Sequence, residues 1–130
     1  MTARGSRTAL ALAGLLGAAG TLHFVAPEFF DGMVPDVLPG GPRLWTYVSG
    51  AAEIAVAVAV AVPRTRRPGG LAAAALFVAV FPANVEMAID WSDRSLTEQV
   101  IAYARLPLQV PLIWWAWRVH RDAPTRPGPA

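Results

Sequence analysis

The sequence predicts an all-α fold: a transmembrane four-helix bundle with both termini in the cytoplasm (N-in/C-in). One observation is the composition, because 55% of the 130 residues are hydrophobic and only 15% are charged, and the mean hydropathy is +0.42. Soluble domains carry roughly 25% charged residues, and a chain this short buries too little surface to hide so many apolar side chains. The lipid bilayer is therefore the expected solvent.

The second observation is a set of four apolar runs, each about as long as a membrane crossing. About 20 helical residues cross a hydrocarbon core about 30 Å thick. The predicted spans are residues 8–25, 44–62, 70–89 and 99–117. We expect them to form one domain over residues 1–121, followed by a disordered, proline-rich tail over residues 122–130.

The third observation is the distribution of the arginines, which supply all of the Lys and Arg side chains. They cluster before the first span, between the second and third spans, and after the fourth: Arg4, Arg7, Arg64, Arg66, Arg67, Arg118, Arg121 and Arg126. The other two connections are acidic overall. The positive-inside rule therefore places both termini in the cytoplasm, which agrees with an even number of spans.

Residues 1–19 have a second interpretation. A basic start, an apolar stretch and the small residues Gly17, Ala18 and Ala19 are also typical of a cleaved signal peptide. We favour the uncleaved chain, because cleavage would leave three spans and an odd-numbered topology for the remaining arginine clusters. The mass of the purified protein distinguishes the two, since an intact N-terminus excludes cleavage.

Residues 26–42 connect the first two predicted spans and differ from an ordinary loop. Their prolines and glycines prevent a long helix, but the segment contains more apolar side chains than a solvated loop would: Phe29, Phe30, Met33, Val34, Val37 and Leu38. We expect a compact extracytoplasmic segment with short helical turns, lying on the outer mouth of the bundle or dipping into it. A simple interfacial anchor is the alternative.

Six polar side chains fall at similar depth in the outer part of the predicted spans. They are His23, Glu53, Asn84, Glu86, Arg105 and Gln109. Polar groups in a membrane usually face the interior of a bundle or a water-filled cavity, so we predict an outer-facing ligand-binding pocket here. We expect Arg105 to pair with Glu53 or Glu86, and the other carboxyl group, beside His23, could exchange protons. The alternative is an ion pair that only fixes helix packing.

Three prolines lie near these polar residues: Pro82 in the third span, and Pro107 and Pro111 in the fourth. A proline removes a backbone hydrogen bond and permits a helix kink, and kinked helices expose carbonyl groups where they line a cavity. We expect kinks at all three prolines; the alternative is that they only shape packing.

Several kinds of chemistry are excluded or unsupported. The chain has no cysteine, which excludes a thiol relay or a disulfide scaffold within it. It has no pair of histidines at metal-binding spacing, no phosphate-binding glycine loop and no nucleophile elbow, so we assign neither a metal site nor a catalytic residue. The basic residues lie where topology requires them, and no nucleic-acid partner is expected.

Short motifs along the chain bring a family resemblance. In order they are LHF (22–24), PEFF (27–30), MVPDVLP (33–39), SGAAEI (49–54), PRTRR (63–67), VFPANVEMA (80–88), RLPLQ (105–109) and IWWAW (113–117). With this combination, covering about residues 10–118, the chain resembles the DoxX-like family of small bacterial four-helix integral membrane proteins. The resemblance implies that His23, Glu53, Pro82, Asn84, Arg105, Pro107 and Gln109 belong to the family pattern.

The resemblance also implies a setting: a multi-pass protein of the bacterial plasma membrane. The family's name links it to a membrane subunit of thiosulfate:quinone oxidoreductase, so quinone is the candidate cofactor and a membrane or peripheral redox protein the candidate partner. The leading hypothesis is a subunit or accessory factor of a quinone-linked redox system. The alternatives are a non-catalytic chaperone or scaffold and a component of a small-molecule or proton transporter, each open to homo-oligomerisation.

Overall fold

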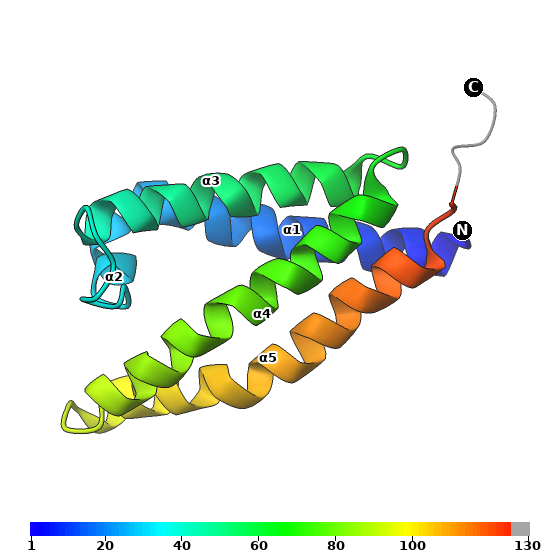
Figure 1. Ribbon diagram of the computed structural model, residues 1–130. Coiled ribbons are helices and arrows are strands. Elements are labelled where there is room, and N and C mark those ends of the chain that lie inside the picture. Colours follow the sequence, from blue (N-terminus) through cyan, green and yellow to red (C-terminus); the bar gives the residue numbers. More distant parts are fainter. Residues whose placement is uncertain (126–130) are drawn as a thin grey trace.

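The computed structural model describes residues 1–125 and is built from helices, with no strand in that part of the chain, which confirms the predicted all-α class. The elements are α1 (Ala3–Val25), α2 (Pro27–Asp31), α3 (Pro42–Ala61), α4 (Arg66–Asp90) and α5 (Leu96–Asp122). The four long helices run antiparallel in chain order, so the start of α1 and the end of α5 lie at one end of the molecule (Figure 1). We call this the terminal end, and the opposite one the α2 end.

Three helices in the described part of the chain are long and apolar enough to cross a membrane: α1, α3 and α4, with 23, 20 and 25 residues. The fourth predicted span corresponds to α5, the longest helix at 27 residues. It does not reach the same apolar level, because Arg105 and Gln109 interrupt its apolar stretch. The structure therefore supports a membrane protein with three candidate spans out of the four predicted.

The long helices extend past most ends of the apolar runs that predicted them, because polar residues form several of their first and last turns. Helix α1 begins after Thr2, whose hydroxyl oxygen accepts a hydrogen bond from the backbone N–H of Gly5 at 3.0 Å. Helix α5 begins after Ser95, which caps the N–H of Glu98 in the same way at 3.3 Å. Such caps satisfy backbone donors at a helix start.

Helix α5 also extends into the predicted tail. It ends at Asp122, and the next residue, Ala123, is buried. Residues 126–130 of the tail, and with them Arg126 of the third arginine cluster, lie outside the described residues.

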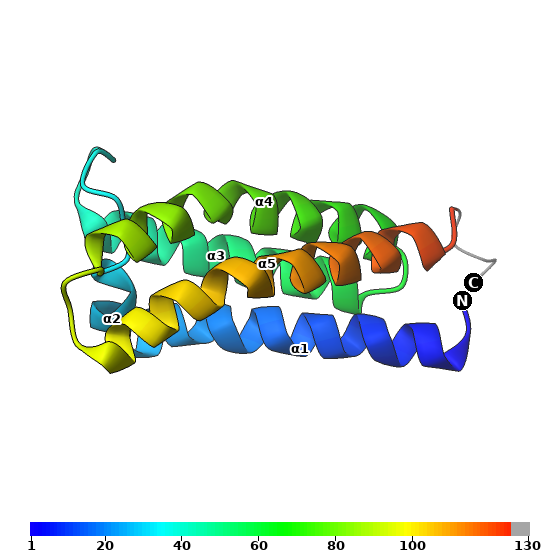
Figure 2. The same cartoon turned by 90° about the horizontal axis from the view of Figure 1, so that it is seen from below.

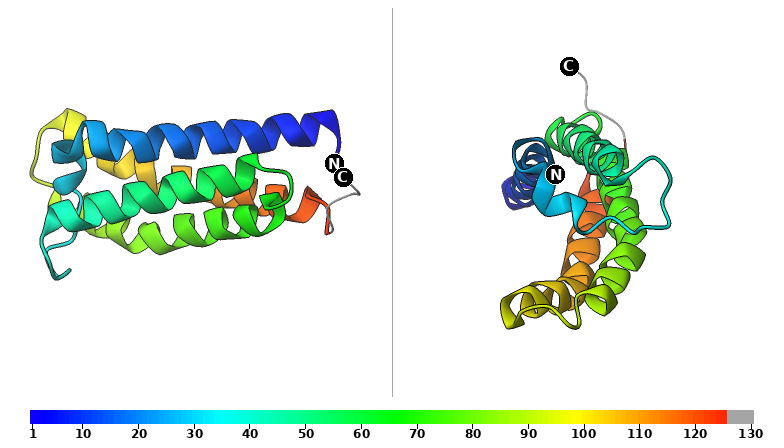
Figure 3. Two further views of the ribbon diagram at one scale, coloured as in Figure 1. Left: turned by 90° about the horizontal axis from the view of Figure 1, so that it is seen from above. Right: turned by 90° about the vertical axis from the view of Figure 1, so that its left-hand side faces the viewer.

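The long helices form two antiparallel pairs, α1 with α3 and α4 with α5, and α3 joins the pairs through its contacts with α4. The pairs lie close together at the terminal end and diverge toward the α2 end (Figure 1), and the view from below shows the N-terminus at the same end as the last turns of α5 (Figure 2). The end-on view shows this separation from the α2 end (Figure 3). A single packed core therefore cannot run the length of the molecule.

Two apolar clusters reflect this shape. The larger one draws side chains from all four long helices, including Leu12, Val60, Phe77 and Val119. The smaller one joins α4 and α5 near the α2 end: Met87, Ala88, Trp91 and Ala102, with Met33 and Leu106 packed against them. Many apolar side chains elsewhere are exposed, as expected for helices surrounded by lipid.

Helices α1 and α3 cross at two glycines. A Cβ atom on Gly50 would lie 2.7 Å from Cβ of His23 and 3.0 Å from the carbonyl oxygen of Gly20. Real Cβ atoms do not approach other atoms so closely, and small residues are what permit such a crossing between membrane helices. The crossing places His23 directly against α3, one turn from Glu53.

Candidate functional site

His23 and Glu53 meet where α1 crosses α3. The imidazole is buried, with His23 8% exposed overall. Its Nδ1 atom lies 2.7 Å from the carbonyl oxygen of Ala19 and 3.4 Å from Oε2 of Glu53. A carbonyl oxygen can only accept, so Nδ1 carries the proton and donates it to Ala19. This contact fixes the ring beside the carboxyl group, and Nε2 forms no hydrogen bond with the described residues.

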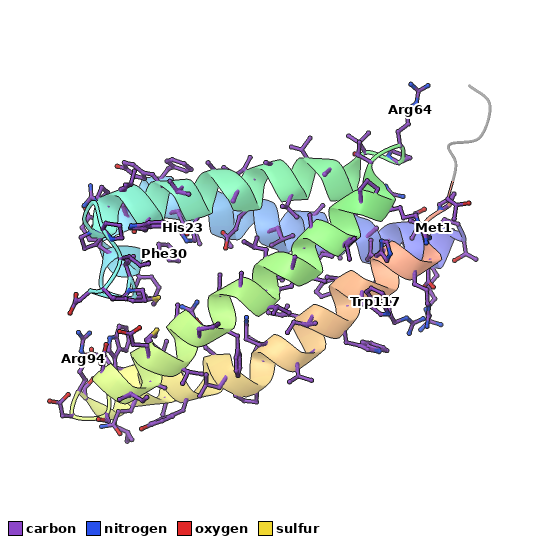
Figure 4. All side chains as sticks on the ribbon, viewed as in Figure 1. Met1, His23, Phe30, Arg64, Arg94 and Trp117 are labelled. Atoms are coloured by element: carbon purple, nitrogen blue, oxygen red, sulfur yellow. The ribbon has the colours of Figure 1, made fainter. Side chains whose placement is uncertain are left out.

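Helix α2 covers one face of the imidazole. Phe30 stacks on His23, with ring centroids 3.7 Å apart and planes 15° from parallel. Both rings point into the space between the helix pairs at the α2 end (Figure 4). Phe29 meets Phe30 edge-on, with centroids 5.2 Å apart. The short helix therefore supplies a flat aromatic wall beside the only two acid–base groups in close contact within the described part of the helices' interior.

Two buried polar atoms have no hydrogen-bond partner among the described residues: Oε2 of Glu53 and Nδ2 of Asn84. The Glu53 side chain is 18% exposed, although its Oε2 atom is itself buried. An unsatisfied buried polar group costs about 1–3 kcal/mol. These two atoms are therefore the places where a ligand would gain most from a hydrogen bond.

Arg105 projects from α5 toward the connection between α2 and α3. Its Nη1 donates to Sδ of Met33 at 2.8 Å. The predicted ion pair of Arg105 with Glu53 or Glu86 does not form: no pair within 4.0 Å links these residues in the described chain. The reason is the divergence of the helix pairs, which separates α5 from α3 at this level.

The other predicted site residues have separate roles. Nε2 of Gln109 donates to the carbonyl oxygen of Phe77 at 2.7 Å, and both groups are buried, so this amide ties α5 to α4. Glu86 is partly exposed and forms no hydrogen bond or ion pair with the described residues. The structure thus brings together His23 and Glu53, with Arg105 at a distance, and does not bring Gln109 or Glu86 into contact with them.

The three predicted kink prolines lie on exposed surfaces of continuous helices, Pro82 in α4 and Pro107 and Pro111 in α5. Each removes the usual partner of the carbonyl group four residues earlier. Those carbonyls belong to residues that are also exposed, such as Val78 and Tyr103, and do not face the site. The prolines therefore shape the helices, and α5 bends along its length (Figure 1), but the expected cavity-lining carbonyls are not found there.

A polar network that the sequence did not reveal holds α2 against α3. The hydroxyl of Thr46, which is 1% exposed, donates to Oδ1 of Asp31 at 2.6 Å. Nε of Arg43 donates to Oδ2 of the same carboxylate at 2.9 Å. The hydrogen bond from Thr46, reinforced by Arg43, holds the pKa of Asp31 below its usual value of 3.8. No sequence signal marks this network, because its members lie 12 and 15 residues apart.

Comparison with known protein families assigns the chain to a family. A family model described as a domain of unknown function, DUF8561, matches residues 12–120. The chain belongs to the DUF8561 family. The matched region of this DUF8561 chain begins inside α1 and ends inside α5, so it includes every residue of the site described above. No curated protein and no solved structure matches it, and the resemblance to the DoxX-like family stays a prediction.

Proposed function

We propose that this protein is a multi-pass protein of the bacterial plasma membrane in which α5 crosses the bilayer beside α1, α3 and α4. Two features support this topology. Helix α5 packs against α4, a candidate span, and is long enough to cross. Arg64 lies at the terminal end and Arg94 at the opposite end (Figure 4), and the arginine-rich segments near Arg64 would then face the cytoplasm together with both termini.

We further propose that the outer half of the molecule binds the polar head group of a small apolar molecule, with quinone as the candidate. The observation that carries this proposal is the unpartnered, buried Oε2 of Glu53 beside the stacked rings of His23 and Phe30. A quinone head group is a flat ring with oxygen atoms at its edge. The aromatic wall suits the ring, and the donors and acceptors at its margin suit the oxygens.

The residues present fit such a head group in defined roles. Glu53 would accept a hydrogen bond from a hydroxyl of the reduced form, or donate one when protonated. Arg105, with N–H groups beyond the one that faces Met33, would donate to a ring oxygen. His23, held by Ala19 through Nδ1, would present Nε2 to exchange a proton. The bound quinone would supply the redox chemistry, and this chain would bind, orient and move protons.

The chain would work with a partner that carries electrons. It contains no cysteine, and within residues 1–125 no group of three His, Cys, Asp or Glu side chains is arranged to hold a metal ion. A role as a subunit or accessory factor therefore suits these residues better than a complete oxidoreductase. This role agrees with the DoxX-like resemblance, which we retain as part of the proposal.

The test is direct binding of short-chain ubiquinone and menaquinone to the purified protein in nanodiscs. We expect saturable binding by the wild type. Glu53→Gln should weaken binding about tenfold or more, because a hydrogen bond to a charged group contributes about 1.5–3 kcal/mol. Glu86→Gln is the matched control, because the sequence predicted Glu86 in the same site but its carboxylate forms no hydrogen bond or ion pair with the described residues. Folded wild-type protein that shows no saturable binding would overturn the proposal.

A non-catalytic scaffold is the second candidate, and specific contacts favour it. Gln109 joins α5 to Phe77 of α4, and His23 joins α1 to Glu53 of α3. Such contacts hold helices in register without any ligand. Native mass spectrometry from a gentle detergent separates the two functions. A retained small molecule supports the head-group site, whereas a retained partner protein without a small molecule supports the scaffold.

A further inference from the structure

A hollow lies at the terminal end, at the other end of the helices from the site described above. It has a volume of about 350 Å³ and lies between the first turns of α1 and the last turns of α5. Its lining includes Arg4, Thr8, Trp114, Trp115, Arg118 and Asp122. Small-molecule sites typically measure about 300–1,000 Å³, so the hollow is large enough for a small polar group.

A hydrogen bond joins the two helices that line the hollow. The indole Nε1 of Trp115 donates to the carbonyl oxygen of Thr8 at 3.1 Å, which ties α5 to α1. The hydroxyl of Thr8 donates in turn to the carbonyl oxygen of Arg4 at 2.9 Å. These bonds fix the relative positions of the two helix ends, and with them the backbone positions of Arg4 and Arg118.

The charges around the hollow favour an anion. Arg118 and Arg4 line it against a single acidic residue, Asp122. That carboxylate is already contacted by Nη2 of Arg118 at 3.8 Å and by Nε of Arg121 at 3.0 Å. Arg4 has no ion pair within 4.0 Å in the described part of the chain. A guanidinium group binds phosphate with paired N–H donors, which makes arginine the preferred residue for this anion.

The aromatic side chains favour a lipid as the source of that anion. Trp114 is 59% exposed and lies under the guanidinium of Arg118, with 4.9 Å between Cζ and the ring centroid. Tryptophan is enriched at the depth of lipid head groups. Leu10 and Trp117 are also exposed apolar side chains, and Met1 and Trp117 both lie at the terminal end (Figure 4). Acyl chains could follow this surface.

We propose that the hollow between α1 and α5 binds the phosphate of an anionic phospholipid head group, with Arg4 and Arg118 as the phosphate-binding side chains and Trp114 and Trp115 bordering the glycerol region. The site is independent of the head-group site near His23. It places a lipid contact in the leaflet that the arginine clusters face.

The test measures phosphatidylglycerol against phosphatidylcholine. The protein is reconstituted in nanodiscs containing both lipids, and the lipids retained after release into detergent are counted by native mass spectrometry, with affinities from titration of phosphatidylglycerol. We expect retention of phosphatidylglycerol in preference to phosphatidylcholine. Arg4→Gln combined with Arg118→Gln should lower the affinity for phosphatidylglycerol about 10- to 30-fold.

The matched control combines Arg7→Gln with Arg64→Gln, which removes the same charge from the same end but does not alter the hollow. It should change the affinity less than about threefold. Equal losses in the two double variants would mean general attraction to an anionic surface and would overturn the proposal. If the first double variant does not fold, Arg4→Gln alone serves as the test, because Arg4 is exposed on the first turn of α1 and its replacement should leave the fold intact. It should weaken phosphatidylglycerol binding about fivefold.

Inorganic phosphate distinguishes a lipid from a soluble source of the same anion. We expect an excess of inorganic phosphate to leave the bound phosphatidylglycerol in place. Complete displacement by inorganic phosphate, with saturable phosphate binding in lipid-free detergent, would assign the hollow to a soluble phosphate compound and overturn the lipid proposal.

Discussion

Because α1 and α3 cross so closely, we predict that replacing Gly50 by alanine destabilises the protein. In Gly50→Ala, the new Cβ would meet Cβ of His23 at 2.7 Å, a ring carbon of Phe24 at 2.9 Å and the carbonyl oxygen of Gly20 at 3.0 Å. One of these atoms belongs to the backbone and another is the Cβ of a packed side chain, so neither can rotate away. The two helices would have to separate.

The size of the effect follows from two opposing contributions. Overpacking of a tight contact costs about 1–3 kcal/mol, and three simultaneous close contacts place Gly50→Ala near the upper value. Replacing glycine by alanine within a helix raises the free energy of unfolding by about 0.5–1 kcal/mol. We therefore expect the free energy of unfolding to fall by about 2 kcal/mol.

Gly14→Ala is the matched control, because Gly14 lies in α1 and a Cβ atom added to it would meet no other atom within 4 Å. It should raise the free energy of unfolding by about 0.5–1 kcal/mol. Both variants can be measured by reversible unfolding in mixed micelles, followed by circular dichroism. Equal stability of the two variants would show that α1 and α3 do not approach as closely as described, and the position of His23 against Glu53 would lose its basis.

Two further predictions concern contacts between elements. The pKa of Asp31 is lowered in the folded protein, so the stability that its carboxylate contributes is present above the ordinary pKa of 3.8 and is lost as pH falls through the lower folded value. Thr46→Val should bring the pKa of Asp31, measured by carboxyl NMR, back toward 3.8. An unchanged pKa would show that the hydrogen bond from Thr46 does not lower it. Gln109→Leu removes the donor to the carbonyl of Phe77 and should lower the free energy of unfolding in micelles by about 0.5–2 kcal/mol, whereas an unchanged value would mean that this bond does not join α4 to α5.

The sequence was a good guide to the elements and a poorer one to their ends. Apolar runs of about 20 residues identify membrane-length helices because lipid requires that length. They do not reveal polar first turns, which is why the sequence did not predict that α1 begins directly after Thr2 and α5 directly after Ser95. The same limit applies to α5, where Arg105 lies within an otherwise apolar run and lowers the signal.

The candidate site was predictable in depth but not in its contacts. Opposite chain directions place His23, Glu53 and Arg105 at a similar level, and this can be worked out from residue spacing alone. The partner of Arg105 cannot, because it depends on how far the helix pairs diverge and on where the connection after α2 folds back. Met33 occupies the position next to the guanidinium, where the sequence had led us to expect Glu53 or Glu86.

The divergence of the helix pairs also has a mechanical consequence. Since the pairs share an apolar cluster that includes Leu12 and Val119 at one end and separate toward the other (Figure 3), the shared cluster would be the pivot of any rotation of one pair against the other. A small rotation about this cluster would leave the arginine-rich end almost still, and the resulting displacement would grow with distance along the helices. Met33, from the connection after α2, and Arg105 of α5 are in contact across the wide end, so breaking this contact would free the two pairs to change their separation there.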